Sequence, residues 1–167
     1  MICYLSLGAN LGDRAGALSH ALARLDAHAH ITLRQVSPVY ETRAVADEPQ
    51  PDYLNLVAAI ETDLQPRQLL AAVQGIENEL GRARPYRHAP RTMDMDLLLC
   101  GDIMVATTEL TLPHPQMLRR QFVLQPLADL DPTLRVGGAP PVGQLTNRHD
   151  PEVRLVGTLA ELTGGGV

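Results

Sequence analysis

The chain has 167 residues, a length that suits one domain with a sizeable apolar core. Apolar residues make up 45% and charged residues 20%, the balance of a folded globular protein, so fibrous and disordered classes are excluded. The formal net charge of −5 argues against a nucleic acid or an anionic membrane as the partner. All 14 basic residues are arginine, which excludes chemistry that requires a lysine, such as a Schiff base.

The first residues lack the basic flank and long apolar run of a signal peptide, and no apolar stretch is long enough to span a membrane. We therefore expect a cytoplasmic protein that contacts no membrane. Two cysteines, Cys3 and Cys100, are too few for a disulfide framework and lack the spacing of a metal site. We expect both to be reduced, buried thiols.

The periodicity of apolar residues predicts the elements of the first part of the chain. Residues 1–8 predict a short buried strand, and Asp13 can cap the helix that follows. The apolar stripe of this helix recurs at helical spacing and consists of Leu18, Ala21, Leu22 and Leu25. Residues 31–36 alternate with period two and predict a half-exposed strand that runs on towards Tyr40, before a loop at 41–51.

Residues 53–62 predict a strongly apolar strand, and the helix after it has clear end signals. Pro66 suits the first helical position, where its missing N–H costs nothing, and Gly81 can end the helix in a left-handed conformation. An arginine-rich loop at 82–92 then leads into a predicted strand at 93–100.

The order of these elements, β-α-β-β-α-β, predicts a ferredoxin-like α+β sandwich. Right-handed crossovers then give an antiparallel sheet with its helices on one face, and the two cysteines come near each other on neighbouring strands. Residues 119–130 predict a third helix. We expect a single domain over residues 1–167, with its core in residues 1–130 and a peripheral segment over residues 131–167.

The densest chemical signal lies at residues 82–96, where four of the 14 arginines precede two aspartates. Asp94 and Asp96 are two positions apart on a predicted strand, so their side chains point to the same face. At a rise of about 3.3 Å per residue their Cα atoms lie about 7 Å apart, and their carboxylates can converge on a pair of Mg²⁺ ions. A solvated strand face paired with arginines is the alternative, but the apolar neighbours favour a buried strand, on which acids need a partner. Arginine together with Mg²⁺ is a common combination for binding a polyphosphate.

Seven segments, in order along residues 1–130, repeat the motifs of one enzyme family. They read LGANLGDR at 7–14, SPVYET at 37–42, QPDYLN at 50–55, IENELGR at 76–82, RTMDMD at 91–96, LPHP at 112–115 and RQFVL at 120–124. On these residues the chain resembles the 6-hydroxymethyl-7,8-dihydropterin pyrophosphokinases of folate biosynthesis. The resemblance implies a ferredoxin-like fold with long active-site loops. It also implies transfer of the diphosphoryl group of ATP to the hydroxymethyl group of the pterin, with AMP as the other product.

The resemblance implies roles for individual residues on the ATP side. Asp94 and Asp96 would hold two Mg²⁺ that bridge the triphosphate. The identity of the base for the hydroxyl proton stays open at this point, with Asp96 as the nearest candidate acceptor. Arg82 and Arg91 would clamp the phosphates as charge moves to the leaving AMP. Further contacts to ATP would come from Gln74, Glu77, Arg84, Thr111, His114 and Arg120.

A flat slot for the pterin is the second site that the resemblance implies. The ring would stack between Phe122 and Tyr53, and Asn55, which both donates and accepts, would bind the pyrimidine edge. Thr42 and Val45 would add hydrogen bonds from the backbone. Plain core packing is the alternative for Phe122.

Several positions depart from the family pattern. His88 stands where a bulky aromatic residue is common, Ala89 where glycine is common, and Glu109 where a basic residue is frequent. The residues alone leave two rival functions open, a two-metal nucleotidyl transferase or nuclease and a ligand-binding module that is not an enzyme. We favour the pyrophosphokinase, and we expect a monomer that binds ATP, 6-hydroxymethyl-7,8-dihydropterin and Mg²⁺, but no nucleic acid.

Overall fold

The computed structural model describes residues 1–43, 52–80 and 93–164. In these residues the main sheet consists of β1 (Ile2–Ala9), β2 (Ile31–Val36), β3 (Val39–Thr42), β4 (Tyr53–Thr62), β5 (Asp94–Cys100) and β8 (Val153–Gly157). The helices are α1 (Arg14–Ala27), α2 (Pro66–Leu80), α3 (Gln121–Leu130), α4 (Val142–Leu145) and α5 (Leu159–Leu162), with a 3₁₀ turn at Met117–Arg119. A small hairpin pairs β6 (Val105–Ala106) with β7 (Thr111–Leu112).

The sheet confirms the predicted ferredoxin-like α+β topology. Its strand order is β5-β1-β4-β3-β8, with β2 also paired to β4, and every pairing is antiparallel. The strand that we expected to continue from residue 31 towards Tyr40 is divided into β2 and β3 at Ser37 and Pro38. A proline lacks the N–H that a continuous ladder needs. The Ser37 hydroxyl instead accepts a hydrogen bond from the Val57 N–H at 2.9 Å.

The first two helices begin as the sequence predicts. The Asp13 carboxylate caps α1 by accepting a hydrogen bond from the Gly16 N–H at 3.0 Å, and Pro66 is the first residue of α2. Their buried side chains are Leu18, Ala21, Leu22 and Leu25 on α1 and Pro66, Leu69, Val73 and Ile76 on α2. These two helices therefore cover one face of the sheet and form its larger core.

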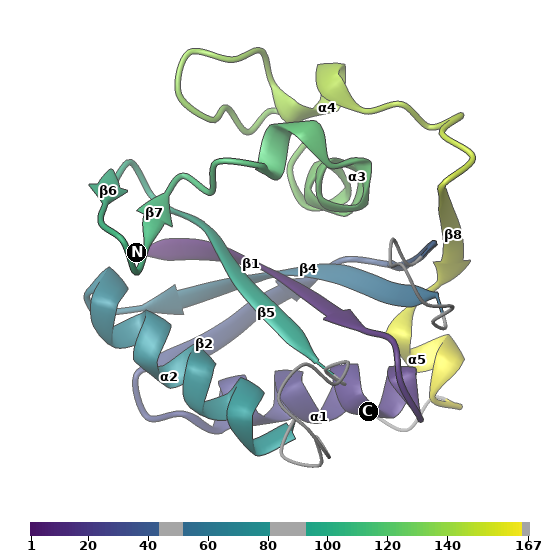
Figure 1. The fold of residues 1–167 in the computed structure, drawn as a ribbon, viewed down its shortest axis with the longest axis horizontal. Helices are drawn as coiled ribbons and strands as arrows, with labels where there is room; N and C mark the ends of the chain where they lie inside the picture. Colours follow the sequence, from purple (N-terminus) through teal and green to yellow (C-terminus); the bar gives the residue numbers. More distant parts are fainter. Residues whose placement is uncertain (44–51, 81–92, 165–167) are drawn as a thin grey trace.

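The two helices of the predicted core, α1 and α2, share one face of the sheet as expected, and α3 and α4, for which no face was predicted, cover the opposite face (Figure 1). That face of the sheet is apolar at Val57, Leu98 and Leu99, and all three pack in a second cluster with α3 residues such as Leu127. A β-bulge at Leu98 in the pairing of β5 with β1 turns the consecutive residues Leu98 and Leu99 both towards this cluster. Burying this second apolar face requires a second layer of helices.

The segment after Leu130, which we expected to be peripheral, adds an edge strand and part of the second core. β8 pairs with β3, and Val136 and Val142 are buried beside α3. The Arg148 guanidinium donates to the Tyr40 hydroxyl at 2.7 Å and to Asp129 on α3 at 2.9 Å. This segment therefore ties α3 to the sheet.

The cysteines meet as the topology predicts. Cys3 and Cys100 are register partners on β1 and β5, both are fully buried and both are free thiols. The hydrogen bond between them and their burial raise the pKa of the Cys3 thiol. None of the helices in the described parts of the chain has the length and apolar character to cross a membrane.

Candidate active site

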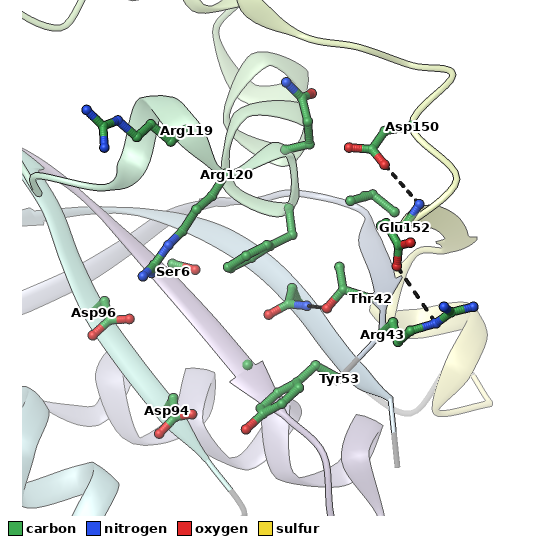
Figure 2. A pocket seen from close by; sticks show the side chains of 15 residues that line it. Ser6, Thr42, Arg43, Tyr53, Asp94, Asp96, Arg119, Arg120, Asp150 and Glu152 are labelled. Carbon is green, nitrogen blue, oxygen red and sulfur yellow. Dashed lines mark hydrogen bonds and ion pairs between the residues drawn. The ribbon is translucent and has the colours of Figure 1, made fainter. Parts of the chain in front are cut away.

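Two carboxylates stand side by side on β5, on the face of the sheet that α3 covers. Met93, Met95 and Leu97 point into the core under α1 and α2, so the alternation of the strand turns Asp94 and Asp96 the other way. Figure 2 shows both aspartates on the same side of the strand, where Asp94 is half-buried and Asp96 exposed. The neighbouring strand β1 contributes only small residues here.

The first cavity has a volume of about 770 Å³ and lies between the sheet and the start of α3. It is lined by Ser6, Gly8, Thr42, Arg43, Tyr53, Asn55, Asp94, Asp96, Arg119, Arg120, Gln121, Phe122, Asp150, Glu152 and Val153. The volume is in the usual range for a small-molecule site. Four predicted pterin-binding residues, Thr42, Tyr53, Asn55 and Phe122, therefore meet in one cavity with the aspartate pair.

The amide of Asn55 is fixed inside this cavity. Its Nδ2 donates to the Thr42 hydroxyl at 2.7 Å, and both side chains are buried. Its Oδ1 lies over Gly8, where an added Cβ would stand only 2.8 Å away. The glycine thus leaves the space that the amide occupies, and the amide presents a defined polar edge to a ligand.

Two aromatic rings also line the first cavity. Tyr53 lies near the carboxylate pair, and burial together with the negative charge of Asp94 raises the pKa of its hydroxyl. Phe122 is half-buried and packs in part against the second core. The guanidinium carbon of Arg120 lies 5.7 Å from the centroid of the Phe122 ring, within range of a cation–π contact.

A second cavity of about 570 Å³ lies on the other side of the same two aspartates, towards α2. It is lined by Leu70, Gln74, Glu77, Asp94, Met95, Asp96, Leu97, Thr108, Glu109, Leu110, Thr111, His114 and Pro115. Four residues predicted on the ATP side, Gln74, Glu77, Thr111 and His114, are among them. Glu77 also stabilises the start of β5, because its carboxylate accepts a hydrogen bond from the Met95 N–H at 2.8 Å.

The surroundings of His114 favour the neutral form of its imidazole. Its Nδ1 accepts a hydrogen bond from the Gln116 N–H at 3.1 Å, so the proton of the neutral ring is on Nε2. Burial lowers the pKa of His114, the negative charge of Asp96 offsets part of this effect, and Arg120 adds to it. A neutral His114 can donate one hydrogen bond into the second cavity.

Arg120 is the one described ATP-side residue that lies elsewhere. It lines the first cavity instead of the second, and in Figure 2 its side chain extends from the start of α3 towards Asp96. It therefore lies near the junction of the two cavities. The predicted residues Val45, Arg82, Arg84 and Arg91 lie outside the described residues, as do His88 and Ala89.

Part of the wall of the first cavity was not predicted from the sequence. Gly8 gave a usable signal, since a glycine inside a strand often marks close approach of another group. Asp150, Glu152 and Val153 gave none, because they follow a segment rich in proline and glycine and reach the cavity only through the pairing of β8 with β3. At that end the Arg43 guanidinium lies 3.8 Å from the Glu152 carboxylate (Figure 2).

The carboxylates of Asp94 and Asp96, which line both cavities, suit a hard cation that also coordinates a bound phosphate. Oxygen atoms of carboxylates are preferred by Mg²⁺, which takes few protein ligands and completes its octahedron with water and phosphate. Within the described ranges, no group of three or more His, Cys, Asp or Glu side chains is arranged to enclose a metal. Asp94 and Asp96, two carboxylates on one face of β5, are the residues that would supply protein ligands to such an ion.

Comparison with known proteins places the chain in a family. The family model described as 7,8-dihydro-6-hydroxymethylpterin-pyrophosphokinase (HPPK) matches residues 4–132. The chain belongs to the HPPK family. The matched range contains the aspartate pair and the described residues of both cavities except those on and just before β8.

Curated relatives of the HPPK family are similar over most of the chain. The 2-amino-4-hydroxy-6-hydroxymethyldihydropteridine pyrophosphokinase of Bacillus subtilis is 47% identical over 129 residues, which are 77% of this chain and 77% of that protein. The Pseudomonas aeruginosa protein of the same name is 41% identical over 150 residues, 90% of this chain and 88% of the relative. The folic acid synthesis protein fol1 of Schizosaccharomyces pombe is 41% identical over 133 residues, which are 80% of this chain and 18% of that protein.

Solved structures of HPPK proteins share the fold. The crystal structure of Plasmodium falciparum HPPK-DHPS wild type with pterin and p-hydroxybenzoate has a TM-score of 0.67 and 14% identity to this chain. The similarity covers 86% of this chain and 42% of that one.

Proposed function

We propose that this chain transfers the diphosphoryl group of ATP to the hydroxymethyl group of 6-hydroxymethyl-7,8-dihydropterin, giving AMP and the pterin diphosphate in folate biosynthesis. One observation carries the proposal beyond family membership. Two cavities meet at Asp94 and Asp96: the first is lined by the rings of Tyr53 and Phe122, and the second by polar side chains such as His114. A reaction that joins a heteroaromatic alcohol to a polyphosphate needs two such cavities with a shared charged junction.

The first cavity suits the pterin. The rings of Tyr53 and Phe122 supply flat apolar surfaces, and the Asn55 amide, already bonded to Thr42, keeps its carbonyl oxygen as an acceptor for the N–H groups of a pyrimidine edge. With that edge at Asn55, the substituted end of the bicycle points along the cavity to the aspartates. The side chains of this chain therefore orient the alcohol before any bond is made.

The second cavity suits the nucleotide. The neutral His114 donates from Nε2 to a phosphate oxygen, while Gln74 and Thr111 offer polar contacts to the rest of ATP. Asp94 and Asp96 would hold two Mg²⁺, which when bound neutralise phosphate oxygens and acidify the alcohol. Asp96, the more exposed of the two aspartates, would accept the alcohol proton. We assign Arg82 and Arg91 to the phosphates from the family motif, with Arg84 as a further ATP contact, and Val45 to the backbone contacts with the pterin.

We also propose that the protein works as a monomer in the cytoplasm. Cys3 and Cys100 face each other on paired strands as free thiols, which fits a reducing compartment.

The test is a reaction with ATP, Mg²⁺ and 6-hydroxymethyl-7,8-dihydropterin, in which AMP and pterin diphosphate are measured together. We expect equal amounts of the two products, and we expect Asp94→Asn and Asp96→Asn each to lower kcat about a hundredfold or more. Asp102→Asn, at an exposed position just after β5, is the matched control and should retain full activity. AMP without pterin diphosphate, or full activity of both aspartate variants, would contradict the proposal.

A further inference from the structure

A chain of ionic contacts lies behind the first cavity, on the other face of the sheet. Nη1 of Arg14, at the start of α1, donates to the Glu41 carboxylate at 2.8 Å and to the Asp52 carbonyl oxygen at 2.8 Å. The other carboxylate oxygen of Glu41 accepts a hydrogen bond from Arg154 on β8. We call the three charged side chains, Arg14, Glu41 and Arg154, the clamp.

The register of the strands connects the clamp to the pterin side of the site. Thr42 faces the cavity, so its neighbour Glu41 points to the opposite face. Thr42 is the register partner of Tyr53, and this pair ends the β3–β4 ladder (Figure 2 shows both side chains in the cavity). Arg14 thus holds β3 through the Glu41 carboxylate and also bonds to the backbone of Asp52, the residue just before β4.

The electrostatics of Glu41 make the clamp stiff. Its side chain is 17% exposed and that of Arg14 is 30% exposed, so their attraction is screened less than that of a surface pair. The hydrogen bond from Arg14 lowers the pKa of Glu41, and burial partly opposes this lowering. The hydrogen bond from Arg154 lowers the pKa further. Charge-assisted hydrogen bonds on both carboxylate oxygens fix the side chain and the end of β3 with it.

We propose that Arg14, Glu41 and Arg154 are positioning residues for the pterin. None of them lines either cavity, and they act by holding the ends of β3 and β4 at the separation that sets Thr42, Tyr53 and Asn55 around the ring. Arg154 lies outside residues 4–132, which match the HPPK family model, so β8 contributes to pterin recognition from beyond that match. The inference rests on the proposed function, because it assumes that the first cavity binds the pterin.

The experiment measures KM for the pterin, KM for ATP and kcat in Arg14→Met and Arg154→Met, which keep an unbranched side chain and lose the charge. We expect the pterin KM to rise about five- to twentyfold in Arg14→Met while kcat and the ATP KM stay within about twofold. The more exposed Arg154 should give a smaller rise in the same constant. Arg34→Met is the matched control, because Arg34 pairs with Glu61 across β2 and β4 and lines neither cavity.

Glu41→Gln and the double variant Arg14→Met with Glu41→Gln complete the design. If the pair acts as a unit, the double variant has the same pterin KM as the single variants. Equal pterin KM values in Arg14→Met and Arg34→Met would overturn the inference. A fall in kcat together with a rise in the KM values of both substrates and a lower melting temperature would also overturn the inference, because that combination is the signature of general destabilisation. Absence of pterin diphosphate with the wild-type chain would instead remove the proposed function, and the inference with it.

Discussion

Gly8 is the residue at which a single added carbon tests the geometry of the pterin site. A Cβ at this position on β1 would stand 2.8 Å from Oδ1 of Asn55 and 3.5 Å from a ring carbon of Tyr53. Carbon and carbonyl oxygen approach to about 3.3 Å in proteins, so the Asn55 oxygen would have to move by about 0.5 Å. Asn55 is only 4% exposed, and its Nδ2 is bonded to Thr42 at 2.7 Å. The amide therefore cannot move without straining that hydrogen bond.

Gly8→Ala should change ligand binding much more than stability. Replacing a glycine inside a strand stabilises the fold by about 0.5–1 kcal/mol, and straining a hydrogen bond costs about 1 kcal/mol, so the free energy of unfolding should stay within about 1 kcal/mol of wild type. A displaced amide loses one hydrogen bond to the pterin, worth about 1–1.5 kcal/mol. Since about 1.4 kcal/mol corresponds to a factor of ten, the pterin KM should rise about tenfold.

The assay varies pterin and ATP separately while product formation is followed, and urea unfolding measures stability. Gly75→Ala is the matched control, because Gly75 lies on the exposed side of α2 with no atom near the position of a Cβ. It should gain up to about 1 kcal/mol from helix propensity and leave the pterin KM unchanged. A wild-type pterin KM in Gly8→Ala would refute the argument that this glycine makes room for the amide.

Three further predictions follow from the electrostatics. The pKa of His114, followed by NMR titration, should lie below its ordinary value of 6.5. Asp96→Asn should lower this pKa further, because the negative charge of Asp96 raises the pKa of the buried ring. A pKa that is the same in the variant and in the wild type would contradict this. Tyr40→Phe removes a hydroxyl that bonds to Arg148 and to a carboxylate on α3, so urea unfolding should show a loss of about 1–2 kcal/mol; wild-type stability would show that the contact contributes nothing. The pKa of Glu41 is lower in the folded state than its ordinary 4.5, so its ionised form stabilises the fold above that pH and the effect disappears as the pH falls. The melting temperatures of wild type and Glu41→Gln should therefore differ by a constant amount above about pH 4.5 and converge as the pH falls below it, and a difference that stays constant at acid pH would refute the assignment.

The parts of the site that the sequence predicted are those set by local periodicity. Asp94 and Asp96, like Tyr53 and Asn55, are two positions apart on strands, and the structure places each pair on one face. Such a pattern does not reveal which strands become neighbours. Gly8 opposes both Asp94 and Asn55 only because β1 lies between β5 and β4.

The features that the sequence did not predict concern elements whose packing partners are distant in the chain. The apolar stripe of α3 shows that this helix packs on something, but the stripe does not say on which face of the sheet. β8 is short and partly exposed, and its pairing with β3 joins residues such as Glu41 and Arg154 that are far apart in the chain. Neither relation has a local sequence signal, because both depend on which surfaces remain uncovered after the first core has formed.

The amino-acid sequence by itself determined the β-α-β-β-α-β order of the core elements, the starts of the first two helices and the shared face of the two aspartates. Each of these depends on contacts within a few residues, where backbone geometry alone fixes the outcome. Tertiary structure decided that two cavities open on opposite sides of Asp94 and Asp96, that α3 closes one of them, and that β8 completes its far end. Those features arise from long-range strand pairing and from the burial of a second apolar face, which involve the whole chain at once.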